Sequence, residues 1–316
     1  MLSLLVRYFN IGLFRYGVCG LFILVLCLLT ACDAPGSKTS LTVVSTTGMI
    51  HDIVRNIAHD KVDATVLMGP GVDPHLYKAT ESDVLSLARA DIIFYNGLHL
   101  EAKLGDVLSN MAERSHIVAV TDRIDKDTLR MPKEFDGFYD PHVWFDVRLW
   151  LLAIDAVEQA LIHKDKANKE FYIKHATQYR DQLKRLDRYI LNQVSLVPNH
   201  RRILVTAHDA FGYFGDAYGF EVYALQGIST QSEAAIYDVD QLANFIVMRK
   251  IPAIFVESSI SKRHILSVQE AVKAKGWHVV IGGELFSDAL GEPNTPEGTY
   301  IGMLKHNIHS IVDGLK

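Results

Sequence analysis

The stretch that decides the fold is "DKANKEFYIKHATQYRDQLKRLDRYILNQVSL", residues 165–196, which contains neither glycine nor proline. Along it, apolar side chains recur at steps of three and four residues, the spacing that puts them on one face of an α-helix. A helix of roughly 25 residues at 1.5 Å per residue is about 38 Å long, enough to run the length of a small domain. This apolar stripe consists of Tyr172, Ala176, Tyr179, Leu183, Leu186, Ile190 and Val194.

Short β-rich runs alternate with helical patterns on both sides of this helix. Strand–helix–strand alternation is typical of parallel sheets covered by helices. The sequence therefore predicts an α/β protein with two lobes, residues 41–164 and 197–316, joined by one rigid linker helix over residues 165–196. A long surface helix within a single domain is the alternative. The β-rich runs are residues 41–47, 62–68, 90–97, 116–122, 201–208, 221–227, 253–259 and 277–285.

The first 31 residues differ in kind from the rest. Arg7 and Arg15 are their only charges, and an apolar run extends from Val18 to Ala31. A run of about 14 residues is shorter than the roughly 18 to 20 that a transmembrane helix needs, so residues 1–31 read as a signal peptide.

The end of the apolar run, "LTAC" at residues 29–32, resembles a bacterial lipobox. The resemblance implies cleavage before Cys32 and lipidation of its thiol, with an uncleaved signal anchor as the alternative. Residues 32–40 are then a lipidated tether of small, polar residues. Acyl chains on Cys32 would hold the protein at a membrane.

Charge and cysteine content exclude several function classes. Removal of residues 1–31 takes the net charge from −5 to −7, and no basic block is present, so nucleic acid is not an expected partner. Cys19 and Cys27 lie in the signal peptide, and Cys32 is the lipidation site. The mature chain therefore has no thiol for a disulfide or a thiolate metal site.

The Asp-Pro-His triplet occurs twice, in "VDPHLY" (72–77) and in "YDPHVWFD" (139–146). Proline restricts its own φ and the conformation of the residue before it, which limits the direction of the following histidine. Ordinary turn chemistry is the alternative for either copy alone. His75 follows a predicted strand, His142 precedes a helix with Asp146 as its N-cap, and His208 ends another strand.

Ligands bind beyond the carboxyl ends of the strands in open α/β sheets, so these histidines are expected to meet between the lobes. Three neutral imidazoles carry no charge to balance a divalent cation, and a carboxylate is therefore expected beside them. Residues 282–298 offer Glu284, Asp288, Glu292 and Glu297, and spacing alone does not choose between them. Asp209 and Asp146 are candidates to accept a hydrogen bond from an imidazole, whereas His99 and Glu257 are expected to be structural.

Five motifs, "VDPHLY", "NGLHLE", "YDPHVWFD", "TAHDAFGYF" and "LFSDALGE", resemble the TroA-like family of metal-binding lipoproteins that serve ABC importers. The resemblance runs from about Leu41 to the C-terminus. It implies two Rossmann-like lobes joined by a long helix, with a metal between them. His75, His142 and His208 match the family's histidine positions, and Asp288 matches its carboxylate.

The resemblance implies a function in transport and no enzymatic activity. The cargo is zinc, manganese or iron, since imidazole and carboxylate ligands suit all three. The implied partners are a membrane permease and its cytoplasmic ATPase, with the protein monomeric and held outside the cytoplasm, in a periplasm or on a cell surface. The alternatives are a zinc hydrolase and an adhesin. The sequence contains no H-E-x-x-H motif, which is found in many zinc hydrolases. The stiff linker is expected to restrict lobe closure, so that release proceeds by local loop movement.

Overall fold

The computed structural model describes residues 40–111, 115–135 and 137–316, and residues 40–316 form one compact unit. The predicted signal peptide and Cys32 lie outside the described residues. Across the described part of the chain, no helix is both long enough and apolar enough to cross a membrane.

The first half of the chain forms a four-stranded parallel sheet in the order β2-β1-β3-β4. The central strand β1 pairs with both neighbours, so that Val43 lies opposite Ala64 on one side and Ile92 on the other. This is the strand–helix alternation that the sequence predicts. The elements are β1 (Leu41–Ser45), α2 (Gly48–Ala58), β2 (Val62–Val66), α3 (Glu81–Arg89), β3 (Ile92–Tyr95), α4 (Gly105–Met111) and β4 (His116–Ala119).

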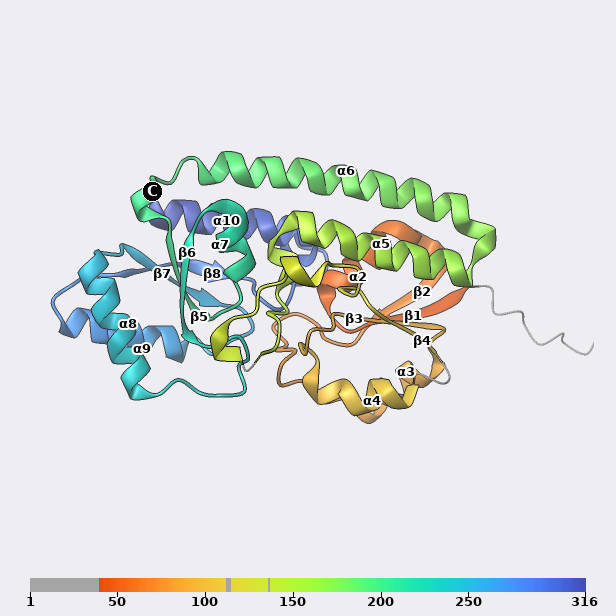
Figure 1. The fold of residues 1–316 in the computed structure, drawn as a ribbon, viewed down its shortest axis with the longest axis horizontal. Coiled ribbons are helices and arrows are strands. Elements are labelled where there is room, and N and C mark those ends of the chain that lie inside the picture. Colours follow the sequence, from red (N-terminus) through yellow and green to blue (C-terminus); the bar gives the residue numbers. More distant parts are fainter. Residues whose placement is uncertain (1–39, 112–114, 136) are drawn as a thin grey trace, which may run out of the picture. The chain divides into compact units, whose positions relative to one another are not determined.

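The second half contains two parallel strand pairs, β5-β6 and β7-β8. Strands β5 and β7 lie next to each other, so the two pairs are neighbours in the fold (Figure 1). The elements are β5 (Ile203–His208), α7 (Gly212–Tyr218), β6 (Glu221–Gln226), α8 (Ile236–Arg249), β7 (Ala253–Glu257), α9 (Arg263–Ala274), β8 (Val280–Leu285) and α10 (Tyr300–Leu315).

Two helices connect the halves: α5 (Val147–Lys164) and the longer α6 (Lys169–Val194). The buried residues of α6 are the seven of the predicted apolar stripe. The helix starts four residues later than the predicted boundary at Asp165, because the Asp165 side chain caps a short 3₁₀ turn, Lys166–Asn168, in front of it.

Helix α6 packs against α2 and α5 from the first half and against α10 from the second (Figure 1). Its stripe, Trp150 of α5 and Tyr300 of α10 belong to one continuous hydrophobic core. Each half also has a smaller core of its own, one around Leu87 and one around Val268. The stripe thus secures both halves to one stiff element.

A buried polar contact accompanies this packing. Asp52 of α2 is 8% exposed, and its carboxylate accepts a hydrogen bond from the hydroxyl of Tyr179 on α6. Burial raises the pKa of Asp52 from 3.8 to about 6, although the Tyr179 hydrogen bond acts in the opposite direction. The ionised carboxylate is therefore unfavourable in the folded state.

The Asp52 pKa predicts a pH-dependent stability. Because the folded pKa is raised, the cost of burying the charge is fully present above about 6 and disappears as the pH falls toward the unfolded value of 3.8. We expect the wild-type free energy of unfolding to rise by up to about 3 kcal/mol relative to Asp52→Asn over this range. Chemical denaturation of both proteins at several pH values measures this difference, and a constant difference contradicts it.

Candidate metal centre

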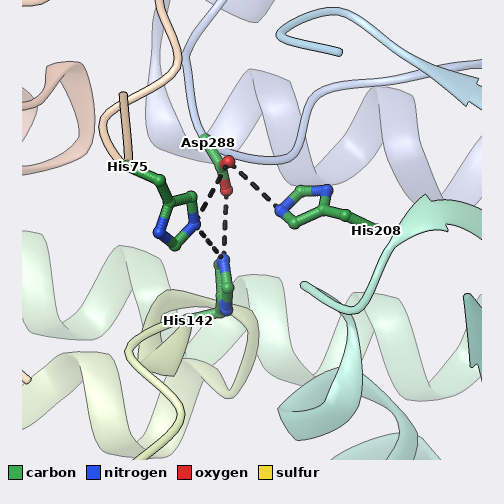
Figure 2. Close-up of side chains that lie close together, drawn as sticks. All are labelled: His75, His142, His208 and Asp288. Atoms are coloured by element: carbon green, nitrogen blue, oxygen red, sulfur yellow. Dashed lines mark hydrogen bonds and ion pairs between the residues drawn. The ribbon is translucent and has the colours of Figure 1, made fainter. Parts of the chain in front are cut away.

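Three imidazoles and one carboxylate meet in the interior of the protein (Figure 2). They belong to His75, His142, His208 and Asp288, and one potential ligand atom from each lies within 4.8 Å of all the others. Their side chains are at most 2% exposed. The structure thus brings together the four residues that the sequence and the family resemblance single out.

The four residues come from four separate segments of the chain. His75 lies in the loop between β2 and α3, and His142 directly precedes a 3₁₀ turn, Val143–Phe145, that leads into α5. His208 is the last residue of β5, and Asp288 follows β8. Asp146 caps α5 through a hydrogen bond from the Arg148 backbone N–H, as the sequence predicts.

The Nε2 atoms of the three rings face the Asp288 carboxylate. Oδ1 of Asp288 lies 3.3 Å from Nε2 of His142, and Oδ2 lies 3.2 Å from that of His208 and 3.8 Å from that of His75. The Nε2 atoms of His75 and His142 are 3.3 Å apart. Around a tetrahedral zinc ion with bonds of about 2.0 to 2.1 Å, neighbouring ligand atoms are roughly 3.3 to 3.4 Å apart, which is close to three of these four distances.

Several of these atoms lack hydrogen-bond partners. Among the described residues, Nε2 of His208 and both oxygens of Asp288 are buried without a hydrogen-bond partner. His208 and Asp288 are close enough to form a hydrogen bond, but their relative orientation is unsuitable. Buried polar atoms without partners cost free energy, and such atoms are rare in folded proteins. A cation at their common centre would satisfy all of them.

The backbone N–H of every histidine in the cluster donates to a nearby carboxylate. Asp73 accepts from His75, Asp140 from His142 and Glu257 from His208, each over 2.9 Å. In the two Asp-Pro-His triplets, the aspartate therefore fixes the histidine two residues later by a direct hydrogen bond, in addition to the restriction that proline imposes.

Two of the rings are also fixed through Nδ1. Asp140 Oδ1 lies 2.8 Å from Nδ1 of His142, and Glu257 Oε2 lies 2.6 Å from Nδ1 of His208. An ionised carboxylate only accepts hydrogen bonds, so Nδ1 carries the proton and Nε2 is the atom available for a metal.

The sequence did not identify these ring partners. Asp209 and Asp146 are the acceptors that the sequence suggests. Asp209 makes no hydrogen bond to an imidazole within the described residues, and Asp146 serves as a helix cap. Glu257 lies at the carboxyl end of β7, beside His208 on β5, and also accepts from the Ala207 backbone N–H. Glutamate is rarely fully buried without a partner, so the burial of Glu257 at a strand end indicates its role as a ring partner.

Contacts around the fourth residue explain why Asp288 reaches the centre. The indole N–H of Trp144 donates to the carbonyl of Ser287, the neighbour of Asp288, over 3.0 Å, and the Trp144 ring packs edge-on against His142. The other acidic residues of this segment point elsewhere: Glu284 pairs with Lys262, Glu297 lies near His306 and Glu292 is exposed.

Neighbouring charges separate the pKa values of the three rings. Burial lowers the pKa of His75 to about 3, and Asp288 opposes this only in part. Burial also disfavours the charged form of His142, but Asp140 and Asp288 outweigh it and raise the pKa to about 9. Glu257 and Asp288 similarly raise the pKa of His208 well above 6.5, whereas the pKa of Asp288 is lowered well below 3.8, since His208 and His142 outweigh its burial.

Comparison with known proteins places the chain in a class and a family. A fold of two α/β halves joined by a long helix, around three histidines and an aspartate, defines a metal-binding substrate-binding protein of the ABC-importer type. The family described as zinc-uptake complex component A, periplasmic, matches residues 43–314, and the chain belongs to it. The family and the relatives are metal-binding transport components and not enzymes, which leaves the hydrolase alternative without support.

Several relatives are similar over most of their length. The zinc-binding protein TroA of Treponema pallidum is 50% identical over 273 residues, which is 86% of this chain and 88% of TroA. The manganese-binding lipoprotein MntA of Bacillus subtilis is 43% identical, covering 96% of this chain and all of MntA.

Solved structures agree with the fold. The structure of TroA from Treponema pallidum has a TM-score of 0.86 and covers 87% of this chain and 99% of its own. A manganese-bound periplasmic metal-binding protein from Candidatus Liberibacter asiaticus has a TM-score of 0.77 at 28% identity, covering 88% of this chain and all of its own.

The raised pKa values predict that a metal ion displaces protons. Nε2 must be unprotonated to bind a metal, and His142 and His208 are both expected to be protonated at neutral pH. We therefore expect proton release on zinc binding and an apparent affinity that increases as the pH rises toward about 9. Titration calorimetry in buffers of different ionisation enthalpy counts the protons; binding heats that do not depend on the buffer contradict the expectation.

Proposed function

We propose that His75, His142, His208 and Asp288 bind one divalent transition-metal ion, which the protein captures outside the cytoplasm and delivers to an ABC importer. The observation that carries this proposal is the convergence of three Nε2 atoms and a carboxylate at one buried point. The orphaned oxygens of Asp288 and the carboxylate-fixed rings of His142 and His208 support it, because both are features of metal ligands.

Zinc, manganese and iron(II) are the proposed cargo ions. The relatives include a zinc-binding protein and a manganese-binding lipoprotein. Intrinsic affinity for such ligands rises from manganese through iron to zinc, so the supply of each metal takes part in deciding the cargo. The spacing of the ligand atoms suits a four-coordinate shell, and the second oxygen of Asp288 allows a fifth bond.

The proposed partners are a membrane permease and its cytoplasmic ATPase. We further propose that residues 1–31 are removed, that Cys32 carries the lipid and that residues 32–40 are the tether. The "LTAC" sequence supports this, as does the description of the Bacillus subtilis relative as a lipoprotein. The protein then works outside the cytoplasm, in a periplasm or on a cell surface.

The proposed domain organisation is an N-terminal lobe over residues 41–164, a linker helix over residues 165–196 and a C-terminal lobe over residues 197–316. The separate small core in each half supports this division. The position of α6 between β4 and β5 also supports it.

Removal of one ligand tests the site. In His142→Ala, one of four donors is lost and Asp288 loses a neighbour, so we expect zinc and manganese affinity to fall by at least about a hundredfold. Competition with a chelator of known affinity measures this change. His200→Ala is the matched control, because His200 is an exposed histidine in the 3₁₀ turn Asn199–Arg201, which precedes β5, whereas His208 lies at the other end of that strand.

Circular dichroism and thermal melting in the presence of a chelator show whether the variants remain folded. Unchanged metal stoichiometry and affinity in a folded His142→Ala protein exclude His142 as a ligand. A failure of both variants to bind indicates damage that is not specific to the site.

Substitution of Cys32 tests the anchor. Cys32→Ser cannot receive a thioether-linked lipid, so we expect the protein to leave the membrane fraction while it keeps its metal affinity. Membrane fractionation of cells and mass spectrometry of the N-terminal peptide measure the two properties. An unmodified wild-type Cys32 in the membrane fraction contradicts the lipidation proposal.

A further inference from the structure

We propose that Thr230 is a positioning residue that controls metal release, because its hydroxyl holds the His75 loop in place from the other half of the chain. The His75 loop is defined as residues 67–80, between β2 and α3. This inference rests on the proposed function, since it names the ligand that leaves first and the contact that retains it.

The three histidines are not restrained equally. Carboxylates hold the rings of His142 and His208 through Nδ1. For His75, no hydrogen bond within the described residues reaches Nδ1, and its ring contacts the other three residues through Nε2, beside His142 and Asp288, and edge-on against His208. Without a partner on Nδ1, the His75 ring can turn away at the lowest cost.

The backbones of the three histidines differ in how firmly they are held, in the same order as their rings. His208 is the last residue of a strand, and His142 is fixed between an Asp140 hydrogen bond and the 3₁₀ turn before α5. His75 lies in the middle of an irregular loop that includes Gly71, whose φ is +70°. Loops with few backbone hydrogen bonds open more readily than strands and helices.

Asp73 is the residue through which this loop is held. Its Oδ1 accepts from the His75 backbone N–H over 2.9 Å, and its Oδ2 accepts from the Thr230 hydroxyl over 2.6 Å. Thr230 lies 157 residues away along the chain, in the loop between β6 and α8. Among the described residues, this is the only hydrogen bond between residues 67–80 and the second half of the chain.

The second Asp-Pro-His triplet is held differently. The second half of the chain contacts it through the hydroxyl of Tyr213, which donates to the carbonyl of Asp140 over 3.0 Å. Asn96 adds a hydrogen bond from its amide to the carbonyl of Pro141, also over 3.0 Å. Loss of one contact therefore leaves the His142 loop held by the other, whereas the His75 loop has only the Thr230 hydrogen bond from the second half of the chain.

The hydrogen bond between Thr230 and Asp73 is partly shielded from water, since Thr230 is 8% exposed and Asp73 is half-buried. A buried hydrogen bond to a charged acceptor is stronger than an exposed one. When it breaks, the Asp73 carboxylate can turn toward solvent, and its hold on the His75 backbone weakens. Metal release by movement of this one loop requires no change in α6.

The test compares Thr230→Val, which removes the hydroxyl and keeps the shape, with Thr230→Ser, which keeps the hydroxyl. The full chain is loaded with zinc, and excess chelator is added to measure the dissociation rate. We expect dissociation from Thr230→Val to be about tenfold faster than from wild type, the effect of one lost hydrogen bond to a carboxylate. Thr230→Ser is expected to stay close to the wild-type rate.

A second measurement separates positioning from general destabilisation. In a His75→Ala background, Thr230→Val should not accelerate dissociation further, because the ligand on which it acts is already gone. Equal acceleration in both backgrounds, or a wild-type rate in Thr230→Val, overturns the proposal. A wild-type protein that binds no zinc contradicts the proposed function itself, whereas tight binding without an effect of Thr230 contradicts only the role of Thr230.

Discussion

The buried carboxylate of Asp288 is the group on which the arrangement of the centre depends. It is 2% exposed, and neither of its oxygens makes a hydrogen bond to another described residue. A buried charge is tolerated only when opposite charge lies close to it. The imidazoles that lie close to this carboxylate come from a loop, a turn and a strand end. Each of them must be placed within a few ångströms of Asp288. The positions of these elements are therefore coupled through one side chain.

Helix α6 provides the framework in which such coupling is possible. Its seven buried side chains pack against elements of both halves in one continuous core. With no glycine or proline in its length, the helix has no obvious place to bend. The four site residues are thus brought together on a stiff support.

Much of this arrangement could be predicted from the sequence, where the information is local. The stripe from Tyr172 to Val194 predicts α6 because helical periodicity depends on neighbouring residues alone. The repeated triplet identifies His75 and His142 in the same way. Asp288 could not be distinguished from Glu284 by spacing, because the choice depends on the path of a loop. Glu257 cannot be recognised from the sequence as a ring partner, because β7 becomes the neighbour of β5 only through the packing of the two strand pairs.

The charges around His142 and His208 have a consequence for the energetics of the centre. Two protons on these rings carry the same total charge as one divalent cation, so capture of the ion is an electroneutral exchange within the buried cluster. The surrounding apolar side chains, such as Trp144, then experience a similar field in both states. Such an exchange needs no compensating movement of charge elsewhere in the protein.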